Sequence, residues 1–187
     1  MTDAFEFAQE TLRIRPPKSE AQAVEVARST LNVGCRRVGG EFTEPDDDWE
    51  QMFLVVERKI ATLITGDAHK HAMAEAVGWF AHRRHALAIG HLASSWMVDF
   101  QGVDAADARR IEREVEAAGG STEGLPNRIE ILLLATYSAS IARGYYARIL
   151  RHEDQPPKLG LFERMPDHGV MQGAMVDPLR ESLVKLG

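Results

Sequence analysis

The stretch from Trp49 to Phe100 carries, in direct succession, the patterns of a β-hairpin, a helix and a third strand. Two apolar runs at 52–57 and 60–65 flank a tight turn at Arg58 and Lys59. A helical spacing of apolar residues follows over 67–85, and another extended apolar run covers 87–98. Strands that follow one another without a helix between each pair are typical of an antiparallel sheet. We therefore predict an α+β fold with a mostly antiparallel sheet and packed helices.

The first strand of this hairpin is apolar on both faces. Side chains alternate along a strand, so Met52, Leu54 and Val56 point one way while Phe53 and Val55 point the other. A strand of this kind needs cover on both sides of the sheet. The predicted N-terminal helix, the charged helix near 104–118 or another subunit is expected to supply that cover.

The flanking segments complete the prediction of one domain, the default for 187 residues. We expect an N-terminal arm at 1–17, an α+β domain at 18–165 and a C-terminal tail with a short helix at 166–187. Ser19 is the predicted N-cap of a helix that runs to about Val33 and is interrupted by Gly34 and by the Gly39–Gly40 pair. Within the domain, 99–127 is predicted to be an insertion that contains a surface helix and a flexible linker at 119–124.

Two segments late in the domain contain residues that favour strands together with residues that oppose or interrupt them. The apolar run at 130–150 favours two strands, although its Leu, Ala and Arg content also permits a helix. The prolines at 156 and 157 are expected to break the chain before a short strand at 159–164.

Charge and cysteine content restrict the expected partners and cellular compartment of the protein. The formal net charge is −6, which disfavours nucleic acid as a partner because duplex-binding proteins usually carry a basic surface. The single cysteine, Cys35, excludes an intrachain disulfide and suits a reducing compartment. A signal peptide and a long apolar run are both missing from the sequence, so we expect a cytoplasmic protein without a membrane partner. The acidic segment 41–50 is expected to be a solvated loop, with a cation site or a docking surface for a basic partner as the alternative.

Sequence signatures of common enzymes are missing from this chain. It contains no GxxxxGK[ST] or GxGxxG phosphate loop, no GxSxG nucleophile turn and no HExxH zinc motif. We therefore expect no cofactor, and the sequence favours a non-enzymatic protein.

Histidines provide one alternative interpretation. His82 and His85 are spaced to share a helix face, and His91 follows shortly after. With a carboxylate such as Asp99, these three could form a metal site of a metal-dependent enzyme. Solvated histidines at helix ends are the simpler interpretation, because no second-shell partner is evident from the sequence.

A basic and aromatic cluster provides a second alternative. Its members lie within ten residues of one another, and in type they resemble the residues that bind single-stranded nucleic acid: Arg143, Tyr145, Tyr146, Arg148 and Arg151. In a strand, however, Tyr146 and Arg148 would lie on the face opposite to the other three. Such a split favours a structural surface or a contact with a protein or an anionic ligand over a nucleic-acid site.

The leading hypothesis is a non-enzymatic binding or assembly module. An apolar sheet with aromatic residues in its arms suits contact with another protein or with a second copy of the chain, and a homo-oligomer is expected. Phe5, Phe7 and Trp49 are candidate contact residues in addition to the cluster at 143–151. A small phage-encoded or accessory bacterial protein fits this profile.

Overall fold

The computed structural model describes residues 8–66, 70–99, 102–117, 125, 128–165 and 176–185. The predictions for Phe5, Phe7 and the linker at 119–124 concern residues outside these ranges. The described elements are, in chain order, β1 (Ala8–Arg13), α1 (Glu20–Gly39), β2 (Met52–Val56), β3 (Ile60–Thr65), α2 (Lys70–Arg83), β4 (Ala88–Val98), α3 (Ala105–Ala117), β5 (Arg128–Tyr137), β6 (Ala142–His152), β7 (Gln155–Leu159), β8 (Glu163–Arg164) and α4 (Val176–Glu181).

All eight described strands belong to one curled antiparallel sheet. Its order is β1-β3-β2-β4-β5-β6-β7, and β8 pairs with β6 beside this path. The predicted hairpin at 52–65 is β2 and β3, and the segment 130–150 forms strands rather than a helix. These findings confirm the predicted α+β class with an antiparallel sheet.

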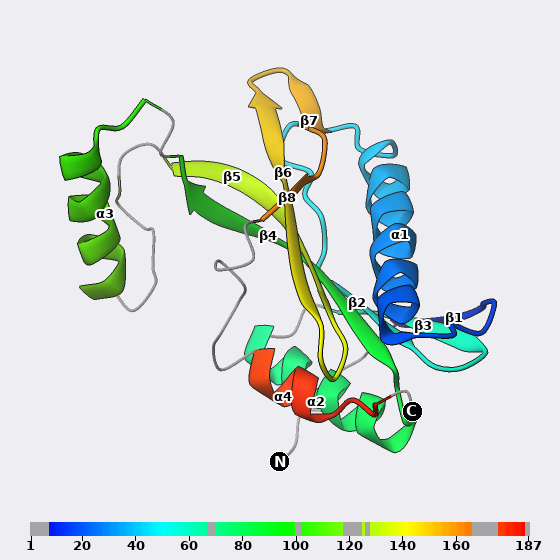
Figure 1. Cartoon of the computed structure of the whole chain (residues 1–187). Helices are drawn as coiled ribbons and strands as arrows, with labels where there is room; N and C mark the ends of the chain where they lie inside the picture. Colours follow the sequence, from blue (N-terminus) through cyan, green and yellow to red (C-terminus); the bar gives the residue numbers. More distant parts are fainter. Residues whose placement is uncertain are drawn as a thin grey trace, which may run out of the picture.

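Helices cover both faces of the sheet, as the two apolar faces of β2 require. Met52, Leu54 and Val56 belong to a core shared with α1. Phe53 and Val55 belong to a second core shared with α2 and α4. Figure 1 shows α1 on one side of the sheet and the α2–α4 pair on the other. The N-terminal helix therefore supplies one cover, and α2 with α4 supplies the other.

The charged helix predicted near 104–118 forms as α3, but it does not lie on the sheet between the other helices. Figure 1 shows it beyond the ends of β4 and β5, away from α1, α2 and α4. Among the described helices, none combines the length and the apolar composition needed to cross a membrane.

The N-terminal helix has the predicted cap and a different end. The Ser19 hydroxyl oxygen accepts a hydrogen bond from the Gln22 N–H, and the Gln22 side chain accepts one from the Lys18 N–H. The expected interruption at Gly34 is wrong, because α1 continues to Gly39. A single glycine inside a helix costs only about 1 kcal/mol relative to alanine, and the packing of Leu31 and Cys35 against the sheet offsets that cost.

Two other segments join the sheet unexpectedly. The expected chain break at Pro156 and Pro157 is also wrong, since both residues lie within β7. β7 is an edge strand with a register irregularity opposite Leu150 to His152, and an edge position tolerates the missing N–H of proline. At the other edge, residues 8–13 of the predicted arm pair with β3 along their whole length.

Candidate functional site

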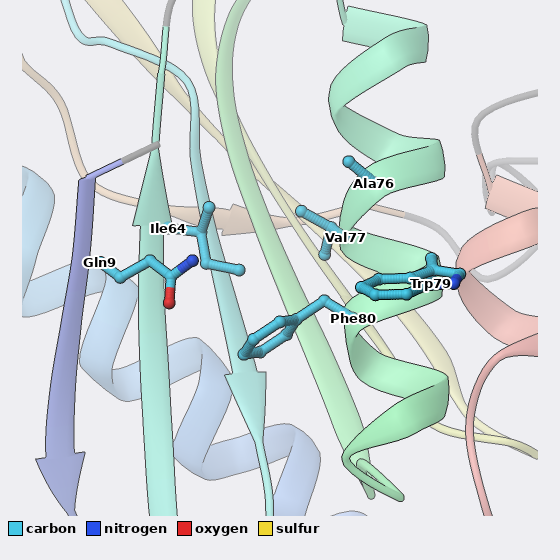
Figure 2. Close-up of a pocket in the computed structure, with 6 residues that line it drawn as sticks. All are labelled: Gln9, Ile64, Ala76, Val77, Trp79 and Phe80. Atoms are coloured by element: carbon cyan, nitrogen blue, oxygen red, sulfur yellow. The ribbon is translucent and has the colours of Figure 1, made fainter. Parts of the chain in front are cut away.

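One surface that could receive another molecule is an apolar groove between the β1–β3 edge of the sheet and α2. It encloses about 460 Å³, and the six described residues that line it carry no charge: Gln9, Ile64, Ala76, Val77, Trp79 and Phe80. Figure 2 shows the side chains of Ile64, Val77 and Phe80 directed into the space between sheet and helix. We refer to this feature as the β1–α2 groove.

The groove exists because α2 covers only part of its face of the sheet. Met73, Val77 and Ala81 are buried and fix α2 over the core that contains Phe53 and Val55. Outward from that core, β3 and β1 continue the sheet and no described helix lies above them, so Gln9 and Ile64 form the sheet wall of the groove. The position of α2 and the added strand β1 together create the cavity.

Aromatic side chains with cationic neighbours form the helical wall. The side chain of Trp79 is 64% exposed, a large value for the residue with the greatest apolar surface. The Arg83 guanidinium lies 5.0 Å from the centre of the Trp79 ring, and that of Arg84 lies 5.4 Å from the Phe80 ring. Arg84 also pairs with the Glu57 carboxylate at 3.3 Å. This wall therefore presents aromatic surface with positive charge at its rim.

The sheet wall ends in an open strand edge. In an antiparallel ladder each residue directs its N–H and C=O either toward the partner strand or away from it. β1 pairs with β3 from Ala8–Thr65 to Arg13–Ile60, and no described strand lies on its other side. Within the described part of the chain, alternate residues of β1 therefore present backbone donors and acceptors that no strand pairs, next to the groove.

The three predicted metal ligands differ in burial, since two are exposed and one lies in the core. His82 and His85 are exposed at the end of α2, and His85 has a positive φ of 52°. His91 is buried in β4, where its ring stacks on Phe53 with centroids 4.4 Å apart. Its Nε2 lies 3.1 Å from the Gln51 amide nitrogen. Over the described part of the chain, no group of three His, Cys, Asp or Glu side chains is placed to hold a metal ion.

The basic and aromatic residues of β6 interact mainly within the protein. Arg28 of α1 lies over the Tyr145 ring, at 5.6 Å from its centre, on the α1 side of the sheet. The Tyr146 hydroxyl donates to Glu163 at 2.7 Å, and this hydrogen bond raises the pKa of the phenol. Arg148 pairs with Asp99 at 2.7 Å. The two faces of β6 therefore separate the cluster, as expected for a strand.

Arg151, a further cation of β6, is also held by contacts within the protein. Arg151 donates to both carboxylate oxygens of Glu130, at 2.7 and 2.8 Å, and to the backbone carbonyls of Pro45 and Asp47. Arg143 is half-buried opposite Thr136. The acidic segment 41–50 is thereby attached to the sheet through Arg151.

Trp49, a predicted contact residue, lies in the core. Only 4% of its surface is exposed, its indole N–H donates to the Cys35 carbonyl at 2.8 Å, and Phe42 meets it edge-on. The Cys35 thiol is buried beside it, and desolvation raises its pKa to about 11. Because a thiolate is the reactive form, this cysteine is chemically quiet at neutral pH.

Sequence reasoning did not select Gln9, Ile64 or Trp79 as a site. Trp79 was recognisable only as a large aromatic residue outside the main apolar stripe of its helix, and Gln9 belonged to a presumed arm. Comparisons with protein-family models, curated proteins and solved structures found no match to this chain.

Proposed function

We propose that this protein is a non-enzymatic binding module that receives an extended segment of a partner polypeptide along β1. The observation that carries the proposal is the position of the apolar β1–α2 groove directly beside an open strand edge. An added strand gains backbone hydrogen bonds from the edge, and pockets next to the edge select its alternate side chains. Neither feature requires catalytic chemistry.

The size and character of the groove define the segment that fits. A volume of about 460 Å³ accommodates large apolar side chains. Burying one such side chain contributes about 1.5–3 kcal/mol, and the exposed Trp79 surface is buried at the same time. The segment should therefore carry large apolar residues at alternate positions, directed toward α2.

Charge at the rim adds a second requirement. Arg83 lies over the Trp79 ring, and Arg84 lies over the Phe80 ring, on the helical wall of the groove. Carboxylates flanking the apolar residues of the segment would complement these cations. The partner is thus an extended, apolar and acidic stretch of another protein or of a second copy of the chain.

A selection from a phage-displayed library of random peptides tests the proposal, followed by fluorescence anisotropy with the labelled peptides it yields. Enriched peptides should show alternating apolar residues with acidic flanks. Trp79→Ala should weaken their binding about tenfold or more, because buried tryptophan anchors contribute about 2 kcal/mol or more. Trp96→Ala is the matched control: Trp96 is 47% exposed and lies on β4 outside the groove, so its loss should leave binding unchanged.

Two results would count against this function. One is a selection that enriches no peptide binding to the folded protein. The other is equal binding by the wild type and Trp79→Ala, with circular dichroism showing that both are folded.

A further inference from the structure

Five exposed cations gather at one end of the molecule, apart from the groove. They come from the end of β1, the segment before α1 and the β2–β3 turn: Arg13, Arg15, Lys18, Arg58 and Lys59. Backbone contacts bring these segments together, since Arg13 pairs with Ile60 and the Ile14 N–H donates to the Lys59 carbonyl at 3.0 Å. Arg15 and Lys18 line one surface hollow of about 380 Å³. We refer to these five residues as the basic end.

The positive charge of the basic end is not neutralised by neighbouring described residues. None of the five side chains takes part in an ion pair or a side-chain hydrogen bond within the described ranges. Three nearby carboxylates are engaged with other groups, since Glu25 pairs with Arg28, Glu57 with Arg84, and Glu20 accepts from two serines. The formal net charge of the whole protein is −6, so the basic end is a positively charged region on a negatively charged protein.

The opposite end of α1 leads into the acidic segment. Residues 41–50 contain six carboxylates and no lysine or arginine: Glu41, Glu44, Asp46, Asp47, Asp48 and Glu50. Lys18 precedes α1 and Glu41 follows it, and a helix of 20 residues is about 30 Å long. Figure 1 shows the segment after α1 beside β7, at the end of the helix remote from β1 and β3. The two charged regions therefore cannot meet within one copy.

The acidic segment is also held in a defined shape. The Asp47 carboxylate accepts the N–H groups of Glu44 and Thr43, which lowers its pKa, and Arg151 donates to two carbonyls of the segment. Arg36 and Arg37 lie in the last turn of α1 at this end, but the carboxylates outnumber them. A preformed acidic loop is a suitable ligand for a cluster of free cations because little ordering is needed on binding.

We infer that the basic end of one copy binds the acidic segment 41–50 of a second copy. The two surfaces differ and lie at opposite ends, so the contact is head to tail and leads to rings or open chains rather than to a two-fold dimer. It does not use the β1–α2 groove and is independent of the function proposed above. A nucleic acid is the competing ligand for the basic end, and the net charge of −6 disfavours it.

Charge-neutral variants test the contact by sedimentation velocity. One variant carries Arg15→Gln, Arg58→Gln and Lys59→Gln, and the other carries Glu44→Gln, Asp46→Asn and Glu50→Gln. The wild type should self-associate at about 0.05 M salt and dissociate at about 1 M salt, where screening acts beyond about 3 Å. Each variant alone should be monomeric. An equimolar mixture should form a heterodimer and nothing larger, because each variant retains the one surface that the other has lost.

Several results would overturn the inference: a monomeric wild type at low salt, a variant that associates as the wild type does, or a mixture that stays monomeric. Binding of a labelled single-stranded oligonucleotide by a monomeric wild type, lost in the first variant, would assign the basic end to nucleic acid instead. Trp79→Ala should associate as the wild type does, which keeps this test separate from that of the groove.

Discussion

At Gly90, the absence of a side chain allows α1 to lie directly on β4. A Cβ atom placed there would be 2.6 Å from Leu31 Cδ1 and 3.2 Å from Ala27 Cβ, both within the helix interface. Gly34 of α1 is the opposite case, because a Cβ there meets nothing within 4 Å. The same residue type is thus required by packing at one position and is only a cost to helix stability at the other.

Two alanine substitutions should separate these roles. Gly90→Ala should lower the free energy of unfolding by about 1–3 kcal/mol, since the added methyl group forces Leu31 and Ala27 apart. Gly34→Ala should raise it by up to about 1 kcal/mol, because alanine favours the helix and has free space there. Urea denaturation of both variants measures the difference. A Gly90→Ala protein as stable as the wild type would show that the interface adjusts without cost.

The residues predicted as ligands illustrate the same dependence on surroundings. His91 stacks on an aromatic ring in the core, and Arg148 and Arg151 pair with carboxylates from distant segments. The partners Asp99 and Glu130 are 49 and 21 residues away in the chain, respectively. A local sequence pattern does not contain such pairings.

At the scale of the element, α2 ends in a Schellman motif with histidine in place of the usual glycine. The Ala86 N–H donates to the Ala81 carbonyl at 3.0 Å, and the His85 N–H donates to the His82 carbonyl at 3.1 Å. His85 itself adopts a φ of 52°, in the left-handed region. Ala81 and Ala86 are both buried in the core beneath α2, so the motif directs the chain from the helix into β4. His85 thus has a structural position that strains its backbone.

His85→Gly should therefore stabilise the protein. Glycine removes the steric cost of the left-handed conformation, about 1 kcal/mol, and keeps both backbone hydrogen bonds. His82→Gly is the control, because His82 lies inside the helix and its replacement should cost about 1 kcal/mol. Thermal unfolding followed by circular dichroism compares the two. A lower melting temperature for His85→Gly would mean that the imidazole makes a stabilising contact.

At the scale of the whole molecule, Glu20 joins the start of α1 to the turn between β5 and β6. One of its carboxylate oxygens accepts from the hydroxyls of Ser138 and Ser140 and from the Ser140 N–H, 118 and 120 residues along the chain. These hydrogen bonds favour the ionised form and lower the pKa of Glu20 below its ordinary value of 4.5, with the Ser138 bond as the largest cause.

Stability should consequently depend on the ionisation of Glu20. A carboxylate with a lowered pKa in the folded state stabilises the protein fully above its unfolded pKa and loses that effect as pH falls through the folded pKa. Glu20→Gln should cost about 1–2 kcal/mol at neutral pH, where charged hydrogen bonds are lost. The difference from wild type should shrink below the ordinary value of 4.5 as Glu20 itself becomes protonated.

Urea titrations at neutral and acidic pH measure this change. Glu112→Gln, at an exposed position of α3, should alter stability by less than about 0.5 kcal/mol at either pH. If Glu20→Gln lowers the free energy of unfolding by the same amount at both pH values, the effect belongs to packing rather than to the carboxylate charge.

Much of the fold was predictable because its cause is local. Alternation in β2 required cover on both faces, and the Ser19–Gln22 pattern marked the start of α1. The failures at Gly34 and Pro156 share a different cause, since both residues are unfavourable locally and are stabilised by distant contacts. The segment 130–150 stayed ambiguous for the same reason, because pairing with β4 decides it.

The sequence by itself determined the α+β class, the antiparallel hairpin, the two-sided core and the charge of the individual segments, because periodicity and composition act over short distances. Only the tertiary structure decided where those segments meet. It placed an open strand beside Trp79 to form the β1–α2 groove, and it put the basic and acidic segments at opposite ends of α1. A binding surface depends on which distant side chains become neighbours, and that is settled only when the whole chain packs.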